Sequence, residues 1–440
     1  MPAGAAGCKW ALFVVGLALL SSLTAIVSLG SDRVSFGDAA DYSYSAHALL
    51  HGSYPRESPR FPVFRPPLYP LLISAVWAVT SPGNVVGVKV VQAFMFAATA
   101  LILCALGRRL HGDEDTAAVG AVLYALYPFA ILLVTDIQTE AFHSLLVGGA
   151  VYALVCAVGA GRVSIGWLIT AGVLFGVATL CRPSALPIGL LLCVAVPWCF
   201  ASTWRPAKRL LVSVAAVVAC VGPILPWTYL NWRATGEFLL VSDAAGYQLW
   251  LGNHPQLLRG YQEEFKNPQE FNRFQYSYLQ NYLVQQQIKD WERTTGYASL
   301  SLGQRERLWR DEAIRNMAAS PSTTARLWLS KLAHFWRPWL SPSAYSPAVV
   351  AGSGVIVSGL YALALAGIFM VIRGGSGGAL RSSRGAWLLL LLFASSAFVH
   401  LPFHTMFRFR LPYVDPYLTV FAAVPLVAVY RRVWARRTPT

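Results

Sequence analysis

Long apolar runs separated by short polar connections make up most of the chain. One further run, at residues 68–80, is shorter and has only 13 residues. A helix that crosses a bilayer needs about 20 residues, so we expect an interfacial or re-entrant helix there. The pattern predicts an all-α polytopic membrane protein with about ten transmembrane helices plus interfacial helices. The ten runs long enough to cross lie near residues 10–30, 84–106, 116–134, 139–160, 164–181, 183–201, 209–230, 347–372, 386–403 and 412–430.

Composition and charge agree with this class. Only 12% of the 440 residues are charged, about half the share in soluble domains, which excludes a soluble enzyme and a disordered chain. If residues 68–80 do not cross, fourteen basic residues fall on one side of the bilayer, which the positive-inside rule makes cytoplasmic. We therefore expect a multi-pass protein of the cell (inner) membrane with both termini cytoplasmic. The net charge of +15 then reflects topology and not a nucleic-acid partner.

Two larger segments then lie outside, at residues 31–83 and 231–346. The chain divides into residues 1–230, a transmembrane module that includes the first outer loop; residues 231–346, an outer helical domain on the periplasmic or extracellular face; and residues 347–440, the C-terminal transmembrane helices. Within the outer domain, the sequence SLGQ at 301–304 has the pattern of a capping box. It predicts a helix from there to about Ala318, followed by a second helix over residues 323–336.

The short outer connections contain arginine but no lysine. The planar guanidinium group fits phosphate in a bidentate manner, so this bias indicates anion recognition, with lipid-headgroup anchoring as the alternative. Arg408 and Arg410 are the least easily explained by anchoring, because they lie between two spans on the side where positive charge is disfavoured. The arginines are Arg33, Arg56, Arg60, Arg65, Arg182, Arg408 and Arg410.

The first outer segment contains candidate acids. Residues 38–50 suit an amphipathic helix on which Asp38 and Asp41, three apart, share a face. A carboxylate at the bilayer edge can act as a general base, whereas Asp38 can equally be the N-cap of this helix, and Asp41 a solvated residue or a secondary ligand. The other face would contain Tyr42, Ala46, Leu49 and Leu50.

Three further features bear on the site. The paired prolines of FRPPLYPLL at 64–72 hold Arg65 at the membrane surface. Glu140, in the polar stretch DIQTEAF at 136–142, is either a site carboxylate or a helix N-terminal residue favoured by the dipole. His47 and His51 have the i, i+4 spacing of metal ligands, but two histidines suit interfacial polar residues better.

These motifs, in this order, resemble the GT-C superfamily of integral-membrane glycosyltransferases, and within it the family 39, dolichyl-phosphate-mannose protein mannosyltransferase-like proteins, related to the lipid A aminoarabinose transferase. The sequence DAADY places Asp38 at the family's catalytic aspartate and Tyr42 at its tyrosine, and RPPLY places Arg65 at its basic position. Further similar motifs are TEAF at 139–142, LCRPSAL at 180–186, PWTYLNWRATGEF at 226–238, GYQLWLGNHP at 246–255, RLWRDEAIRNMAASP at 307–321 and RFRLPYVDP at 408–416.

The resemblance implies an inverting transfer of a sugar from a polyprenyl-phosphate donor to a hydroxyl of a lipid, glycan or protein acceptor, with Asp38 as the general base. Ala39 stands where many members have Glu, so no cofactor is certain and a divalent cation is possible. The residues that we expect to hold the donor phosphate are Arg65, Arg182, Arg408 and Arg410. The candidates for sugar or acceptor contacts are Asp41, Tyr42, Glu140, Trp250 and Asn253.

Two other classes remain open. A transporter or flippase for a lipid-linked sugar would also need outer arginines, but no span contains a mid-membrane charged pair and no inverted repeat is present. A noncatalytic scaffold on a degenerate GT-C fold is consistent with Ala39. The polar residues gather at one face of the membrane, which favours interfacial catalysis.

Overall fold

The computed structural model describes residues 3–34, 38–53, 65–159, 162–263, 282–342, 345–373, 379–403 and 405–435. All regular elements in these ranges are helical, so the predicted all-α class is confirmed. Arg56 and Arg60, two of the outer arginines, lie outside the described residues.

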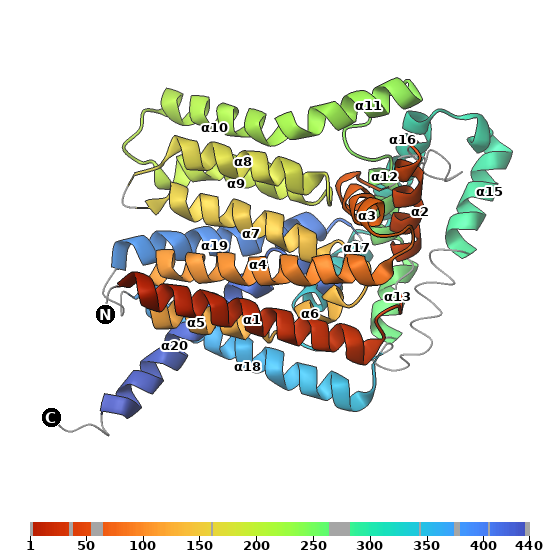
Figure 1. Ribbon diagram of the computed structural model, residues 1–440. Helices are drawn as coiled ribbons and strands as arrows, with labels where there is room; N and C mark the ends of the chain where they lie inside the picture. The colour runs from red at the N-terminus through yellow and green to blue at the C-terminus, as the bar shows by residue number, and fades with distance from the viewer. Residues whose placement is uncertain are drawn as a thin grey trace.

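Apolar helices lie side by side in one bundle and correspond to the ten predicted runs (Figure 1). Within the described residues, seven are long and apolar enough to span a membrane, or eight if α5 and α6, bent by 52°, form one broken span. The remaining two, α8 and α9, have 15 and 16 residues. The bundle helices are α1 (Ala3–Leu29), α4 (Val85–His111), α5 (Glu114–Ala125), α6 (Pro128–Val134), α7 (Glu140–Ala157), α8 (Ile165–Thr179), α9 (Ala185–Phe200), α10 (Pro206–Val221), α11 (Leu225–Thr235), α18 (Pro347–Ile372), α19 (Ala379–His400) and α20 (Asp415–Ala435).

The turn between α4 and α5 shows how the sequence sets the helix ends. Gly112 ends α4 in the left-handed region, with φ +67°, a conformation that suits glycine. Asp113 then caps α5, because its carboxylate accepts a hydrogen bond from the backbone N–H of Thr116 at 3.0 Å. A Cβ atom on Gly107 would lie 2.8 Å from the Cα of Ala117, so the two helices meet at a glycine.

Two short helices follow the first span on the side away from the chain termini: α2 (Asp38–Leu50) and α3 (Leu68–Val79). The helix expected over residues 38–50 is α2, which begins at Asp38, and the short run at residues 68–80 forms α3, which has only 12 residues. Tyr42 and Ala46 are buried as predicted, in a core with Tyr69 of α3, whereas the predicted Leu49 and Leu50 remain partly exposed.

Further helices gather at the same end of the bundle (Figure 1). The capping box is confirmed: Ser301 Oγ accepts from the Gln304 N–H at 3.3 Å, and Gln304 Oε1 accepts from the Ser301 N–H at 2.9 Å. Trp309 lies at the centre of an aromatic cluster there and donates to the hydroxyl of Tyr297 at 2.9 Å. These helices are α12 (Ala245–Asn253), α13 (Gln256–Glu263), α15 (Val284–Thr295), α16 (Leu302–Ala319) and α17 (Pro321–Phe335).

Both chain termini lie at the opposite end of the bundle (Figure 1). This agrees with the expectation that the termini share one side of the membrane. It leaves α2, α3 and the helices between α11 and α18 together on the other side. The assignment of that side to the periplasm or cell exterior remains a prediction from the basic residues.

Candidate active site

A cavity of about 610 Å³ lies where the membrane bundle meets the helices at its far end. Segments far apart in the sequence line it: α2, the Arg65–Pro66 turn, the loop before α7, the turn between α8 and α9, α12, the end of α19 and the turn before α20. Asp38, Asp41, Tyr42, Arg65, Arg182 and Arg408, all singled out from the sequence, are among the lining residues.

Asp38 stands between two arginines at the start of α2. Its Oδ1 accepts from Arg65 Nη2 at 2.8 Å and its Oδ2 accepts from Arg408 Nη2 at 2.7 Å. Burial would raise the pKa of this carboxyl, but Arg408 and Arg65 together hold the pKa well below its usual range. The carboxylate is therefore firmly ionised, and in this arrangement it is a weak base.

Arg65 also connects the two acids of α2. Its Nη2 donates to Asp41 Oδ2 at 2.8 Å as well as to Asp38, and its guanidinium lies 4.8 Å from the centre of the Tyr42 ring. The expectation that Asp38 and Asp41 share a helix face is confirmed, since both contact one arginine. The two differ in exposure: 53% of the Asp41 side chain is exposed, against 30% for Asp38.

Glu140 connects the other two cavity arginines from behind the wall. It is the first residue of α7, and its side chain is only 3% exposed. Its Oε1 accepts from Arg182 Nη1 at 2.7 Å and lies 3.7 Å from Arg408 Nε. Arg408 Nη1 donates to Gln138 Oε1 at 2.8 Å. The three arginines are thus joined through Asp38 and Glu140 into one network.

A buried polar contact holds the loop that provides Gln138 and Glu140. The Gln92 amide of α4 donates to the carbonyls of Val134 and Asp136, at 3.1 and 2.7 Å, and accepts from the Tyr69 hydroxyl. Because a membrane helix bundle cannot leave such backbone groups unpaired, this contact fixes the loop and, with it, the acceptors of Arg408.

Arg410 does not line the cavity, although it is only two residues from Arg408. It is fully buried, and its Nε donates to Asp415 Oδ1 at 2.8 Å. Its Nη1 donates to the backbone carbonyls of Phe335 and Arg337, at 2.8 and 2.6 Å. Arg410 therefore joins the end of α17 to the start of α20 and has no surface to offer a ligand.

Trp250 and Asn253 also lie outside the residues that line the cavity. Trp250 is buried in the aromatic cluster against Trp309, with ring centroids 4.9 Å apart. Asn253 donates to the carbonyl of Pro402 at 2.5 Å and accepts from Trp328 Nε1 at 2.9 Å. Both side chains anchor α12, whose other residues form one wall of the cavity.

Several polar lining residues were not among the sequence candidates, and Gln138 and His400 are two of them. Gln138 belongs to the polar stretch already noted before α7, and His400 ends the apolar run of α19. A polar residue inside or at the end of a span is a functional candidate by itself, so both were recognisable in the sequence as residues without a structural need.

The acids of the cavity do not suit a divalent cation in this arrangement. Among the residues that the structure describes, no three His, Cys, Asp or Glu side chains come together. Asp38, Asp41 and Glu140 each accept from an arginine, and both oxygens of Asp38 are taken in this way. His47 and His51 contact each other, with ring centroids 4.7 Å apart. We therefore derive no step through a metal ion.

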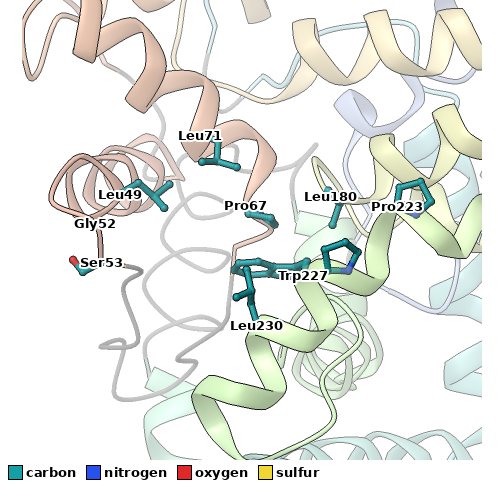
Figure 2. Close-up of a pocket in the computed structure, with 10 residues that line it drawn as sticks. Leu49, Gly52, Ser53, Pro67, Leu71, Leu180, Pro223, Trp227 and Leu230 are labelled. Carbon is teal, nitrogen blue, oxygen red and sulfur yellow. The ribbon is translucent and has the colours of Figure 1, made fainter.

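An apolar hollow of about 420 Å³ adjoins the polar cavity (Figure 2). The two share chain segments: Pro66 lines the cavity and Pro67 the hollow, and likewise Cys181 and Leu180. The Leu68 N–H donates to the Leu180 carbonyl at 3.0 Å, which joins these segments. The other residues that line the hollow are Leu49, Gly52, Ser53, Leu71, Pro223, Pro226, Trp227 and Leu230.

Comparisons with known proteins agree with this geometry. Residues 64–227 match the family model described as dolichyl-phosphate-mannose-protein mannosyltransferase. The comparison with curated proteins gives no match.

Solved structures extend the similarity to almost the whole chain. The oligosaccharyltransferase of Archaeoglobus fulgidus in its apo form aligns with a TM-score of 0.56 and 15% identity, over 97% of this chain and 51% of that chain. Its complex with an inhibitory peptide and a dolichol-phosphate aligns with a TM-score of 0.55, 15% identity and the same coverage. ArnT of Cupriavidus metallidurans in the apo state aligns at 14% identity over 90% of this chain and 78% of that chain, with a TM-score of 0.43. The chain spans about half the length of the oligosaccharyltransferase. The family match covers residues 64–227, and the chain shares its fold with the oligosaccharyltransferase.

Proposed function

We propose that this protein is an inverting glycosyltransferase that moves a sugar from a polyprenyl-phosphate donor to an acceptor hydroxyl at the outer face of the membrane. The observation that carries the proposal is Asp38, an ionised carboxylate that two arginines hold at the wall of a cavity beside the membrane bundle. The cavity thus offers a carboxylate, guanidinium groups and space for a ligand in one place, which supports the proposal.

Arg65, Arg182 and Arg408 are our candidates for the groups that hold the donor phosphate. All three line the cavity, and their side chains are between 11% and 19% exposed, so each can reach a ligand while held by protein partners. Guanidinium groups in a partly desolvated site bind phosphate strongly. The complex of the archaeal oligosaccharyltransferase with a dolichol-phosphate supports a lipid-linked phosphate as the ligand of this fold.

The lipid part of the donor needs an apolar path next to the phosphate. The hollow between Leu49, Leu71 and Leu230 provides one, because it adjoins the cavity through the Pro66–Pro67 and Leu180–Cys181 segments (Figure 2). A donor with its phosphate at Arg65 would have its first isoprene units within reach of this hollow. We assign the hollow to these units as part of the proposed function.

Asp38 becomes an effective base only when its arginines have another anion to bind. Without a ligand, Arg65 and Arg408 both donate to Asp38 and lower its pKa. The donor phosphate competes for the same N–H groups, so its binding weakens their contacts with Asp38 and raises the basicity of the carboxylate. The donor thus prepares the base that its own transfer requires.

The transfer itself is then a single displacement. Asp38 takes the proton of the acceptor hydroxyl while the acceptor oxygen forms a bond to the anomeric carbon. The bond from that carbon to the phosphate oxygen breaks, and its electron pair stays on the phosphate. The arginines stabilise the negative charge that builds on the leaving polyprenyl phosphate, and the configuration at the anomeric carbon inverts.

The test measures release of free polyprenyl phosphate by the purified protein in detergent or vesicles. The assay offers a panel of polyprenyl-phosphate sugars and a membrane extract as the acceptor, and compares wild type with Asp38→Asn. Loss of a general base lowers the rate by about 10²–10⁴-fold. The matched control is Asp290→Asn, which changes an exposed acid of α15 that pairs with Arg293 and should leave the rate unchanged.

The same assay separates the other functions. Tight binding of polyprenyl phosphate without release from any donor would favour a scaffold or a flippase, and a flippase would in addition move a fluorescent lipid-linked sugar between the leaflets of a vesicle. Full turnover by Asp38→Asn would overturn the role of Asp38 as the base. Its role would then be structural, at the N-terminus of α2.

A further inference from the structure

His400 presents one ring nitrogen to the cavity in a fixed position. It is the last residue of α19, it is 6% exposed, and it lines the cavity. Its Nδ1 lies 2.7 Å from the carbonyl oxygen of Ser396. Because a carbonyl oxygen can only accept a hydrogen bond, Nδ1 carries the proton, and Nε2 of the neutral ring is an acceptor.

Neighbouring aromatic rings hold the imidazole in place. The Phe335 ring stacks on it, with centroids 6.0 Å apart and planes at 29°, and the rings of Phe409 and Tyr413 lie 5.5 and 6.0 Å away. These rings and the hydrogen bond to Ser396 together define the orientation of the imidazole. Among the described residues, Nε2 has no hydrogen-bond partner, yet it is not sealed from the cavity.

Phe409 places His400 beside the arginines that we propose hold the phosphate. The Arg182 guanidinium lies over the same Phe409 ring, 4.7 Å from its centre, and the Arg408 guanidinium lies 5.8 Å from it. His400 and both arginines therefore contact one ring at the cavity wall.

Neutral polar side chains also line the cavity. Ser242 and Gln248 lie just before and within α12, and Ser184 lies before α9. The charged groups that line the cavity are Asp38, Asp41 and the three arginines. The cavity therefore offers neutral hydrogen-bonding groups of the kind that recognise hydroxyls, as well as charged groups of the kind that recognise phosphate.

We propose that His400 determines which sugar is transferred, by accepting at Nε2 a hydrogen bond from one hydroxyl of the sugar on the donor phosphate. The proposal rests on the proposed function, since it names a further contact in the same cavity. His400 is a specificity residue that touches the substrate but exchanges no proton in the reaction. A buried site that is built to bind a hydroxyl discriminates against an analogue that lacks it.

The test uses polyprenyl-phosphate mannose and polyprenyl-phosphate glucose, together with the monodeoxy analogues of whichever donor the wild type turns over. The variant His400→Phe keeps a ring for the stack on Phe335 and removes the acceptor. The matched control is His254→Phe, since His254 lies against Trp250 in the aromatic cluster and does not line the cavity. Thermal unfolding of each variant establishes that it is folded.

We expect wild type to lose about tenfold in kcat/KM with one of the deoxy analogues, as one buried hydrogen bond allows. The His400→Phe variant should lose about tenfold with the parent donor and nothing further with that analogue, while its affinity for polyprenyl phosphate without a sugar stays unchanged. The His254→Phe variant should behave as wild type does.

Two results would overturn the assignment. One is a folded His400→Phe protein that discriminates among the deoxy analogues as wild type does. The other is a defect confined to the KM for the acceptor, which would place His400 at the acceptor instead. Failure of wild type to turn over any donor is a different result, since it contradicts the proposed transferase and not the role of His400 alone.

Discussion

Arg408 and Asp38 lie 370 positions apart in the chain, and a hydrogen bond of 2.7 Å joins Arg408 Nη2 to Asp38 Oδ2. This contact connects the start of α2 with the turn before α20. The same guanidinium reaches Gln138 at 2.8 Å and approaches Glu140 at 3.7 Å. The planar fork of arginine faces three acceptors from two segments, so Arg408 organises the cavity as well as lining it.

The variant Arg408→Lys should be severely impaired, because an ammonium group cannot hold these acceptors in a fixed fork geometry. Loss of one preorganised group that stabilises the leaving charge typically lowers kcat by about 10²–10³-fold. We expect a decrease of this size in the release of polyprenyl phosphate. The control is Arg293→Lys, on an exposed pair of α15. Near-wild-type kcat in a folded Arg408→Lys protein would contradict the role of the fork.

The acid limb of the pH–rate profile should depend on which substrate is varied. A base must be ionised, so a lower pKa of Asp38 extends activity to lower pH. In the ligand-free protein, Arg408 and Arg65 hold the Asp38 pKa well below its usual range, and kcat/KM for the donor reports this form. With the donor bound, the arginines face the phosphate and no longer lower the Asp38 pKa as strongly. The acid limb of the kcat profile should therefore lie at higher pH than the acid limb of the kcat/KM profile.

The measurement is the release rate between acidic and neutral pH, first at limiting donor, which gives kcat/KM for the donor, and then with donor and acceptor both saturating, which gives kcat. An acid limb at the same pH in both profiles would show that the phosphate does not draw the arginines from Asp38. The variant Arg408→Gln provides a second check, because removal of one of the two cations should raise the limb in kcat/KM for the donor.

Much of the fold followed from the sequence because bilayer physics constrains it strongly. Apolar runs of about 20 residues must be helical, and the short run at residues 68–80 was predicted as a helix too short to cross and is α3. The number of spanning helices was harder to predict, because α8 and α9 are shorter than the apolar runs that contain them. Helix α8 ends before, and α9 begins after, the proline-containing turn around Arg182–Ser184.

The site was predictable in part. The spacing of Asp38 and Asp41 placed both on one face, and their contact with Arg65 agrees with it. The sequence could not separate Arg408 from Arg410, because two residues in a tight 3₁₀ turn point to opposite sides, one into the cavity and one into the core. That difference depends on Asp415 and on the end of α17, which no local pattern reveals.

The pair Arg410–Asp415 should support stability and not catalysis. Both side chains are fully buried, and Tyr127 donates a second hydrogen bond to Asp415, at 2.7 Å. Removal of one partner leaves a buried charge unpaired, which costs about 3–5 kcal/mol. The variant Arg410→Met should therefore unfold at a clearly lower temperature, with kcat per folded molecule unchanged.

The double variant Arg410→Met with Asp415→Leu checks the physical reason. Replacement of both partners by apolar residues removes the unpaired charge, so the double variant should be more stable than Arg410→Met alone. Thermal unfolding in detergent measures both. If Arg410→Met lost affinity for polyprenyl phosphate at unchanged stability, Arg410 would belong with the phosphate-binding arginines after all.

Lys331 should make the stability of the protein depend on pH. Its side chain is buried in α17, where Nζ donates to the carbonyl of Leu401 at 2.8 Å, and burial lowers the pKa of Lys331 to about 7. The unfolded chain keeps a pKa near the usual 10.5, so between these two values the unfolded state binds more protons than the folded state. Stability therefore rises with pH across this window and is lowest below pH 7, where the buried amine must be charged.

The unfolding temperature should increase between about pH 7 and 9 in wild type, and this increase should be smaller in Lys331→Met, which cannot be charged. The exposed Lys289→Met in α15 is the matched control and should keep the wild-type slope. An equal slope in Lys331→Met would assign the pH dependence to other groups.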